Sequence, residues 1–402
     1  DQDHVPVGLG GAGQPDALNA VRRELDNIWQ AWQLAGEQRA FSFFADTLDA
    51  LLLVFDIAGL IQVARDLCRL AGQQLAAVNP TSPAERIVLA RVQAMEGVFE
   101  FRVGNFARAR ALTEEALDML CDEQADPWVL GHAYIFLGGA YFGLGDLKRT
   151  LAEFHRALDA YTAADSAWGR ATALGNIAEM HMVAGNEAAA LDYAQRAQVI
   201  AEPTGNAYLL VHNTYRLAVL LANAGEYAAA QRYQRASLDY AEQLDYTSGI
   251  GMATASLGDI AFATGEYAVA AQHFADAVEL HRTAGNWMDE ARCLVRQAEA
   301  ALAQEQYEPC RSLLHTALRK AMQADAHAVQ MDALLQVARL WLQQQRSAEA
   351  AALLDHVAAA PASTVATRTI ATELLAAYTS RQSRVEHAKS QIFSLAHVLA
   401  HL

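Results

Sequence analysis

Apolar residues recur at positions i, i+3, i+4 and i+7 through most of the chain, in long stretches separated by short polar turns. This spacing places the apolar side chains on one face of an α-helix, so the pattern predicts a chain built from amphipathic helices. The stretches come in pairs, and each pair spans about forty residues. A helical hairpin of that size cannot bury its apolar face alone, so we expect neighbouring hairpins to stack and share a core.

The turn inside each pair has a recurring signature: a glycine, one further residue, and then an aromatic or large apolar residue that begins the next helical stretch. It occurs as Gly59-Leu60-Ile61, Gly104-Asn105-Phe106, Gly145-Asp146-Leu147, Gly225-Glu226-Tyr227 and Gly265-Glu266-Tyr267. Variants at the same register are Gly185-Asn186-Glu187, Glu305-Gln306-Tyr307 and Gln345-Arg346-Ser347. The spacings are 45 and 41 residues and then 40 five times. Such regular spacing predicts about eight copies of one structural unit.

Small residues recur at fixed distances from this turn. Seven residues before it stand Gly97, Gly138, Ala178, Ala218, Gly258, Ala298 and Ala338. Five residues after it stand Ala64, Ala109, Ala190, Ala230, Ala270 and Ala350. Matched small residues let two helix axes approach closely, and large side chains then fill the space beside them. On this pattern the aromatic residues predicted to lie in the core are Tyr141, Phe154, Tyr267, Phe274 and Trp341.

The order of small residue, glycine turn, aromatic residue and further alanines resembles the tetratricopeptide repeat (TPR) family over roughly residues 41–358. The resemblance implies an all-α fold: a right-handed superhelical solenoid of about eight TPR-like helix hairpins. The period of 40 residues exceeds the roughly 34 residues of the standard repeat, which implies longer helices.

One unit, WGRATALGNIAEMHMVAGNEAAALDYAQRAQVIAEPTGN from Trp168 to Asn206, narrows the resemblance. It is similar to repeats in the sensor domains of signal-transducing ATPases called STAND proteins, which include the maltotriose-responsive transcription activators. Glu24 to Trp32 resembles the helix that leads from the ATPase module into those repeats. The segment from His356 to Pro361, with the helix expected from Thr364 to Tyr378, resembles their capping region.

These resemblances divide the chain into four parts. We expect a flexible linker over residues 1–16, a helical lead-in over 17–40, the TPR-like repeats over 41–358 and a helical cap over 359–402. The family's phosphate-binding loop is missing, because Gly8 to Gly13 is followed by Gln14 and Pro15 where the motif requires Lys and Ser or Thr. An ATPase module is therefore expected on a part of the protein that precedes this chain.

Composition excludes several functions. With 30 Lys and Arg against 46 Asp and Glu, the 402-residue chain has a net charge of −16, which argues against direct nucleic-acid binding. No apolar stretch is long enough to cross a membrane. The four cysteines and thirteen histidines lack metal-ligand spacing, and no catalytic motif is present, so we expect no metal, no cofactor and no enzymatic activity. Scattered cysteines favour a reduced, cytoplasmic protein.

Candidate ligand-binding residues come from the face of each hairpin's first helix that should line the concave surface of the stack. Positions 13, 10, 9 and 6 residues before the turn point there, and the central repeats place polar side chains at them. The selected residues are Asn176, Glu179, His212, Tyr215, Arg216, Asp259, Arg292, Arg296 and Glu299. Rings beside guanidinium and amide groups suit a polar ligand. The alternative is that arginines and carboxylates on neighbouring helices only pair with one another.

The function expected from the resemblance is a non-catalytic sensor. A small polar inducer, or a protein or peptide partner, would bind in the concave groove and control a STAND ATPase regulator. The alternative is a protein–protein interaction scaffold that binds a peptide or helix of a fixed partner, without any small inducer.

Overall fold

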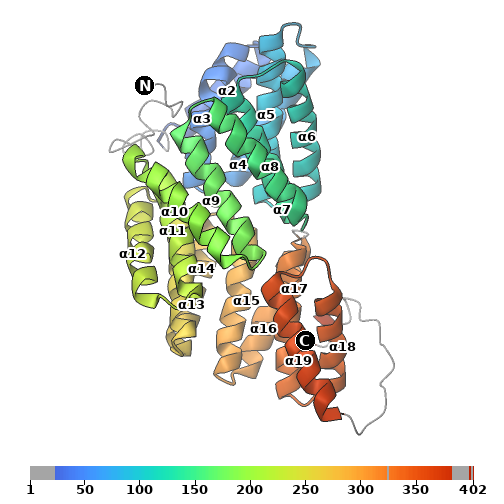
Figure 1. Cartoon of the computed structure of the whole chain (residues 1–402). Coiled ribbons are helices and arrows are strands. Elements are labelled where there is room, and N and C mark those ends of the chain that lie inside the picture. The colour runs from blue at the N-terminus through green and yellow to red at the C-terminus, as the bar shows by residue number, and fades with distance from the viewer. Residues whose placement is uncertain (1–22, 324–325, 383–397, 400–401) are drawn as a thin grey trace.

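The computed structural model describes residues 23–323, 326–382, 398–399 and 402. In this part of the chain the regular structure is entirely helical, with one short 3₁₀ helix (Glu202–Thr204) beside the α-helices (Figure 1). The first helices are α2 (Leu25–Glu37), α3 (Phe41–Ile57), α4 (Ile61–Ala77), α5 (Pro83–Arg102), α6 (Phe106–Asp122), α7 (Pro127–Gly143), α8 (Leu147–Ala163), α9 (Ala167–Val183) and α10 (Glu187–Ala201). They continue with α11 (Ala207–Asn223), α12 (Tyr227–Gln243), α13 (Thr247–Ala263), α14 (Tyr267–Thr283), α15 (Trp287–Ala303), α16 (Tyr307–Gln323), α17 (His327–Gln343), α18 (Ser347–Ala359) and α19 (Val365–Gln382).

In the described part of the chain the helices pair as eight hairpins, from α3–α4 to α17–α18, and each hairpin packs against the next. The predicted all-α superhelical solenoid of TPR-like hairpins is therefore confirmed. Helix α2 falls within the predicted lead-in, and α19 packs on α18 where the cap was expected. The predicted linker over residues 1–16 lies outside the described residues.

The signature glycines end the first helix of a hairpin in the left-handed backbone conformation. Gly145 has φ of 79° and Gly225 has the same value, which is accessible to glycine without steric cost. The two turns that lack glycine keep this geometry, since Glu305 and Gln345 have φ of 60° and 63°. Backbone geometry at the turn is thus preserved where the residue type is not.

The small residues before the turn make room for rings from the second helix. A Cβ atom on Gly138 would lie 2.5 Å from the Phe154 ring, and one on Gly258 would lie 2.7 Å from the Phe274 ring. Four of the five predicted core aromatics are buried. Tyr267 is the exception, because it is the first residue of α14 and its ring rests on Phe262 across the turn, which leaves the residue 37% exposed. The prediction that Tyr267 is core was wrong.

The superhelix closes on itself, so hairpins far apart in sequence touch. A Cβ on Gly59, in the α3–α4 turn, would lie 3.1 Å from the Cα of Ala284, between α14 and α15. A Cβ on Gly185, in the α9–α10 turn, would lie 3.4 Å from the Val365 side chain at the start of α19. The end of α3 is buried in one apolar cluster with α11 and the α12–α13 connection; its members include Val54, Ile57, Val211, Leu244 and Tyr246. This closure brings distant hairpins together around the concave groove.

Candidate ligand-binding site

A cavity of about 410 Å³ lies inside the superhelix. Its walls come mainly from the first helices of the hairpins, namely α3, α5, α7, α9, α11, α13 and α15, with Phe154 and Tyr161 added from α8. This agrees with the expectation that the first helix of each hairpin lines the concave surface. Six of the nine predicted residues line the cavity: Asn176, Glu179, His212, Tyr215, Arg216 and Arg292.

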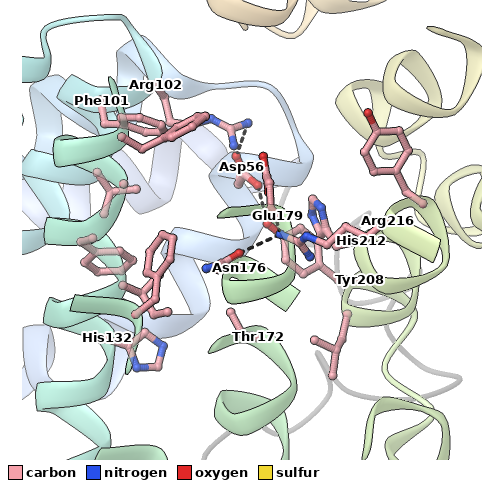
Figure 2. A pocket seen from close by; sticks show the side chains of 18 of the residues that line it. Asp56, Phe101, Arg102, His132, Thr172, Asn176, Glu179, Tyr208, His212 and Arg216 are labelled. Carbon is pink, nitrogen blue, oxygen red and sulfur yellow. Dashed lines mark hydrogen bonds and ion pairs between the residues drawn. The ribbon is translucent and has the colours of Figure 1, made fainter. Parts of the chain in front are cut away.

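Asn176 and Glu179 on α9 meet Arg216 on α11 at one side of the cavity (Figure 2). An Nη of Arg216 donates to Asn176 Oδ1 at 2.7 Å and to Glu179 Oε2 at 3.5 Å. The sequence allows this approach because residue 175 is glycine: a Cβ there would lie 2.9 Å from an Arg216 Nη atom. The guanidinium is therefore held in place across the gap between two hairpins.

Arg292 on α15 lines the same cavity with a less complete set of partners. It pairs with Asp289, whose carboxylate oxygen lies 3.5 Å from Nη1, and 52% of the Arg292 side chain remains exposed. Burial acts to lower the pKa of Arg292, but the carboxylate of Asp289 and the hydroxyl of Tyr215 raise it, so the group stays charged. Its guanidinium retains donors that face the cavity.

His212 is held neutral between these charges. Burial and the nearby guanidinium groups of Arg216 and Arg102 lower its pKa to about 3. Its ring meets those of Tyr208 at 4.8 Å and Tyr246 at 5.8 Å, edge to face. Within the described residues, His212 Nε2 is buried without a hydrogen-bond partner. A buried polar atom left in this state costs about 1–3 kcal/mol, which a ligand group can recover.

The other three predicted residues do not line this cavity. Asp259, Arg296 and Glu299 form a ladder of ion pairs with Arg339 along α13, α15 and α17. Arg296 pairs with Asp259 at 2.8 Å and also with Glu299, and Arg339 reaches Glu299 at 2.7 Å. These residues pair with one another, as the alternative interpretation had allowed.

The cavity also contains a polar group that sequence reasoning missed, centred on Asp56 at the end of α3 (Figure 2). Tyr208 Oη donates to Asp56 Oδ2 at 2.7 Å, Tyr246 Oη lies 3.4 Å from the same oxygen, and Arg102 pairs with Oδ1 at 2.7 Å. The Asp56 carboxylate raises the pKa of Tyr208, as does its burial. No local motif could reveal this contact, because Asp56 and Tyr246 are 190 residues apart.

On the opposite side of the cavity, α7 and α9 present a cluster of rings that was also missed. The His132 ring stacks on Trp168 at 5.4 Å with an interplanar angle of 7°, and it lies 4.1 Å from Trp128 and 5.9 Å from Phe136. His132 Nδ1 lies 3.2 Å from the Trp128 carbonyl oxygen, which places the ring proton on Nδ1. Burial lowers the pKa of His132, so this imidazole is neutral as well.

Tyr161 stands behind these rings. A Cβ on Gly131 or Gly169 would lie 2.7 Å or 2.1 Å from its ring, so the two glycines form the slot that holds it. The Tyr161 hydroxyl is buried, and no described residue forms a hydrogen bond with it. Its ring lies 5.5 Å from His132. The aromatic side of the cavity thus ends in a second unsatisfied polar atom.

No group of three or more His, Cys, Asp or Glu side chains among the described residues is arranged to hold a metal ion. Among the same residues, no helix combines the length and apolar character needed to cross a membrane.

Comparison with known proteins fits this architecture. The structure of NprR with its cognate peptide NprX is similar with a TM-score of 0.60 and 16% identity, covering 82% of this chain and 96% of that chain. The Rap conjugation gene regulator of plasmid pLS20 with the Phr* peptide is similar with a TM-score of 0.59 and 14% identity, covering 93% of this chain and 99% of that chain. A Rap protein complexed with Competence and Sporulation Factor is similar with a TM-score of 0.58 and 14% identity, covering 85% of this chain and 98% of that chain.

At these identities the likeness shows a common fold. No curated protein matches the sequence. Residues 90–400, more than three quarters of the chain, match the model of the MalT-like TPR region. The resemblance seen in the repeats is thereby confirmed, and the chain belongs to the MalT-like TPR region family.

Proposed function

We propose that this chain is a non-catalytic sensor domain that binds an inducer in the cavity on its concave side and thereby controls a STAND ATPase regulator. The observation that carries the proposal is the cavity itself, whose volume of about 410 Å³ lies in the range of small-molecule sites. It combines an apolar wall with a small number of polar groups that converge from several repeats. Such a combination is typical of a binding site.

The chemistry of the lining residues favours holding a ligand over transforming one. With a pKa of about 3, His212 is a weak base at neutral pH and a poor acceptor for a proton in catalysis. Burial raises the pKa of Tyr161 and Tyr208, so these hydroxyls stay protonated and serve as hydrogen-bond donors. The arginines near them are engaged with carboxylates.

A route for the signal follows from the shared wall of the cavity. Asp56, Arg102 and Tyr208 line it, and the same three residues hold the end of α3 against α11. A ligand that contacts them would bind one position of the α3–α4 hairpin better than another, and that difference in affinity is what shifts a conformational equilibrium. In this family the expected ATPase module would precede this hairpin.

The proposal is tested by thermal unfolding of the purified chain with oligosaccharides, nucleosides, amino acids and short peptides. A ligand present at about one hundred times its Kd stabilises the folded state by about 2.7 kcal/mol, which raises the melting temperature measurably. The Arg292→Ala variant should lose the shift, and Arg296→Ala, four residues away on the same helix but outside the cavity, should keep it. If no compound class changes the melting temperature, the sensor proposal fails.

A second candidate is the interaction scaffold, in which a peptide or helix of a fixed partner occupies the groove. The NprR and Rap structures with bound peptides favour it, since they have the same fold. A stoichiometric partner captured without added metabolite, and lost in the Arg292→Ala variant, would support this function over the sensor.

A further inference from the structure

We infer that the ligand of this cavity is an uncharged molecule with a planar aromatic body and a hydrogen-bond acceptor at one end. This inference rests on the proposed function and specifies the ligand class. It follows from three properties of the cavity: how its charges are paired, where its rings lie and which polar atoms lack partners.

The charges that line the cavity are already compensated. Its four carboxylates, Asp49, Asp56, Glu179 and Asp289, each pair with an arginine at 2.7 to 3.5 Å. The two lining histidines are kept neutral by burial. A charged ligand would add an uncompensated charge beside these paired groups, and its desolvation on entering the cavity is costly.

An anion is disfavoured even at Arg292, the guanidinium with the most exposed surface. The carboxylates of Asp289, Glu179 and Asp332 all act on it and raise its pKa. Those carboxylates would repel an anionic ligand group and so oppose its attraction to Arg292. A neutral acceptor such as a carbonyl or ether oxygen takes the hydrogen bond without that repulsion.

The opposite side of the cavity provides the seat for a flat ring. His132, Phe136 and Trp168 are half buried, and all three line the cavity. Neutral rings stack or meet edge to face on such a surface. Met180, Met182, Met252 and Met288 form much of the remaining apolar wall, and their flexible side chains adapt to the outline of a rigid body.

Figure 2 shows His132 on the side of the cavity opposite His212 and Arg216, with Thr172 between them. A ligand with its ring on His132 and Trp168 therefore extends past Thr172 toward the polar side. At that end it meets the donors of Arg292 and the unsatisfied Nε2 of His212.

Two fluorescent probes that differ by one charged group test the lack of charge and the aromatic body: N-phenyl-1-naphthylamine, which is neutral, and its sulfonated counterpart 8-anilino-1-naphthalenesulfonate. Titrated into the intact chain, the neutral probe should bind saturably at one site, at least tenfold more tightly than the sulfonate. Equal or tighter binding of the sulfonate would overturn the assignment of an uncharged ligand.

Two variants locate the neutral probe. Trp168→Ala removes the ring seat, and Thr172→Trp fills the middle of the cavity without removing a buried side chain. Either should weaken binding at least tenfold, while Tyr267→Ala, an exposed aromatic outside the cavity, should leave it unchanged.

Unchanged binding in both cavity variants, or no saturable binding at all, would refute an aromatic ligand. The melting-temperature screen would still decide whether the cavity binds a ligand of another class. Failure of this inference and failure of the sensor proposal are therefore distinguishable.

Discussion

Arg292 and Arg296 stand one turn apart on α15 and have opposite surroundings. Arg292 lines the cavity, is half exposed and has a carboxylate partner 3.5 Å away. Arg296 sits in the ladder, pairs with Asp259 and Glu299, and lies over the rings of Phe262 and Phe274 at 5.1 and 5.5 Å. The same residue type on the same helix thus belongs to a candidate site in one case and to the scaffold in the other.

The difference comes from the closure of the superhelix more than from the repeat. The cavity group comprises Asn176, Glu179, His212, Tyr215, Arg216 and Arg292, and it faces a space whose far walls are α3, α5 and α7. The ladder group comprises Asp259, Arg296, Glu299 and Arg339, and it is absent from that lining. Its charges are satisfied by the adjacent repeats alone. The position of a residue within its repeat decides whether it lies on the concave face. The contact of the α3–α4 hairpin with α11 and the α12–α13 connection decides which part of that face lines the cavity.

The largest loss of stability is expected from breaking the contact between α3 and α11. Asp56→Ala leaves Arg102 without its ion-pair partner and deprives Tyr208 and Tyr246 of their acceptor. Loss of one member of a buried pair costs about 3 kcal/mol or more. Chemical denaturation should show this loss, and hydrogen exchange should accelerate in α3 and the start of α11 but not along the ladder. Asp159→Ala, at an exposed position of α8, is the control and should change stability little. Equal exchange rates in the two regions would show that Asp56 does not hold the closure.

A second prediction concerns pH, because burial keeps a neutral histidine in the cavity group whereas the ladder group contains none. The pKa of His212 is about 3 in the folded chain and about 6.5 when unfolded, so the unfolded state takes up the proton first as pH falls. The contribution of neutral His212 to the free energy of unfolding is therefore fully present above pH 6.5. Below that value, the free energy of unfolding should fall by up to about 1.4 kcal/mol per pH unit until the folded pKa is reached.

Denaturation curves at pH 7.0, 6.0 and 5.0 measure this slope. His212→Gln should reduce the slope by the contribution of one proton, up to about 1.4 kcal/mol per pH unit. The substitution His356→Gln, at an exposed position, should leave the slope as in the unmodified chain. Burial also lowers the pKa of His132 and His281, so a residual slope of the same sign should remain in His212→Gln. An unchanged slope in His212→Gln would contradict the buried neutral imidazole.

The two arginines give a prediction of intermediate size. Arg296→Ala leaves Asp259 without a partner and weakens the ladder, which should cost about 1 kcal/mol because the pair is partly exposed. Arg292→Ala should cost less than about 0.5 kcal/mol, since its ion pair is longer and more exposed. Thermal unfolding compares the two variants directly. A larger loss in Arg292→Ala would reverse the roles assigned to the two groups.

Much of this fold could be predicted from the sequence because its determinants are local and repeated. The turn glycines, the small residues and the helical period each depend on contacts within one hairpin or with the next. The ring of Tyr267 was misplaced because its packing depends on Phe262 across the turn, which the column pattern does not encode.

The cavity could be predicted only in part, for the same reason. Asn176 and Arg216 were found because their positions are fixed by adjacent repeats. Asp56 was missed because its contacts depend on the pitch of the whole superhelix, which accumulates small rotations over several repeats. The aromatic side was missed because only the polar residues of the central repeats were selected, although His132 and Phe136 stand 13 and 9 residues before their turn, at positions predicted to face the groove.

The smallest expected effect concerns the turns, which also differ between the two regions. The turns at Gly145, Gly185 and Gly225 contain glycine, whereas the turns at Glu305 and Gln345, in the two hairpins that carry Arg296, Glu299 and Arg339 of the ladder, do not. A residue with a Cβ is strained at positive φ, and glycine relieves that strain at the cost of a more flexible unfolded chain. Gln345→Gly should therefore stabilise the chain by about 0.5 kcal/mol.

The reverse change, Gly225→Gln, places a side chain at φ 79° where nothing lies within 4 Å of a new Cβ. It should destabilise by a similar amount through the backbone alone. Denaturation midpoints of the two variants test whether the sign of the stability change depends on the backbone conformation of the turn or on the repeat in which the turn lies. If both variants lost stability, side-chain contacts of Gln345 would outweigh its backbone strain, and the ladder repeats would depend on more than their ion pairs.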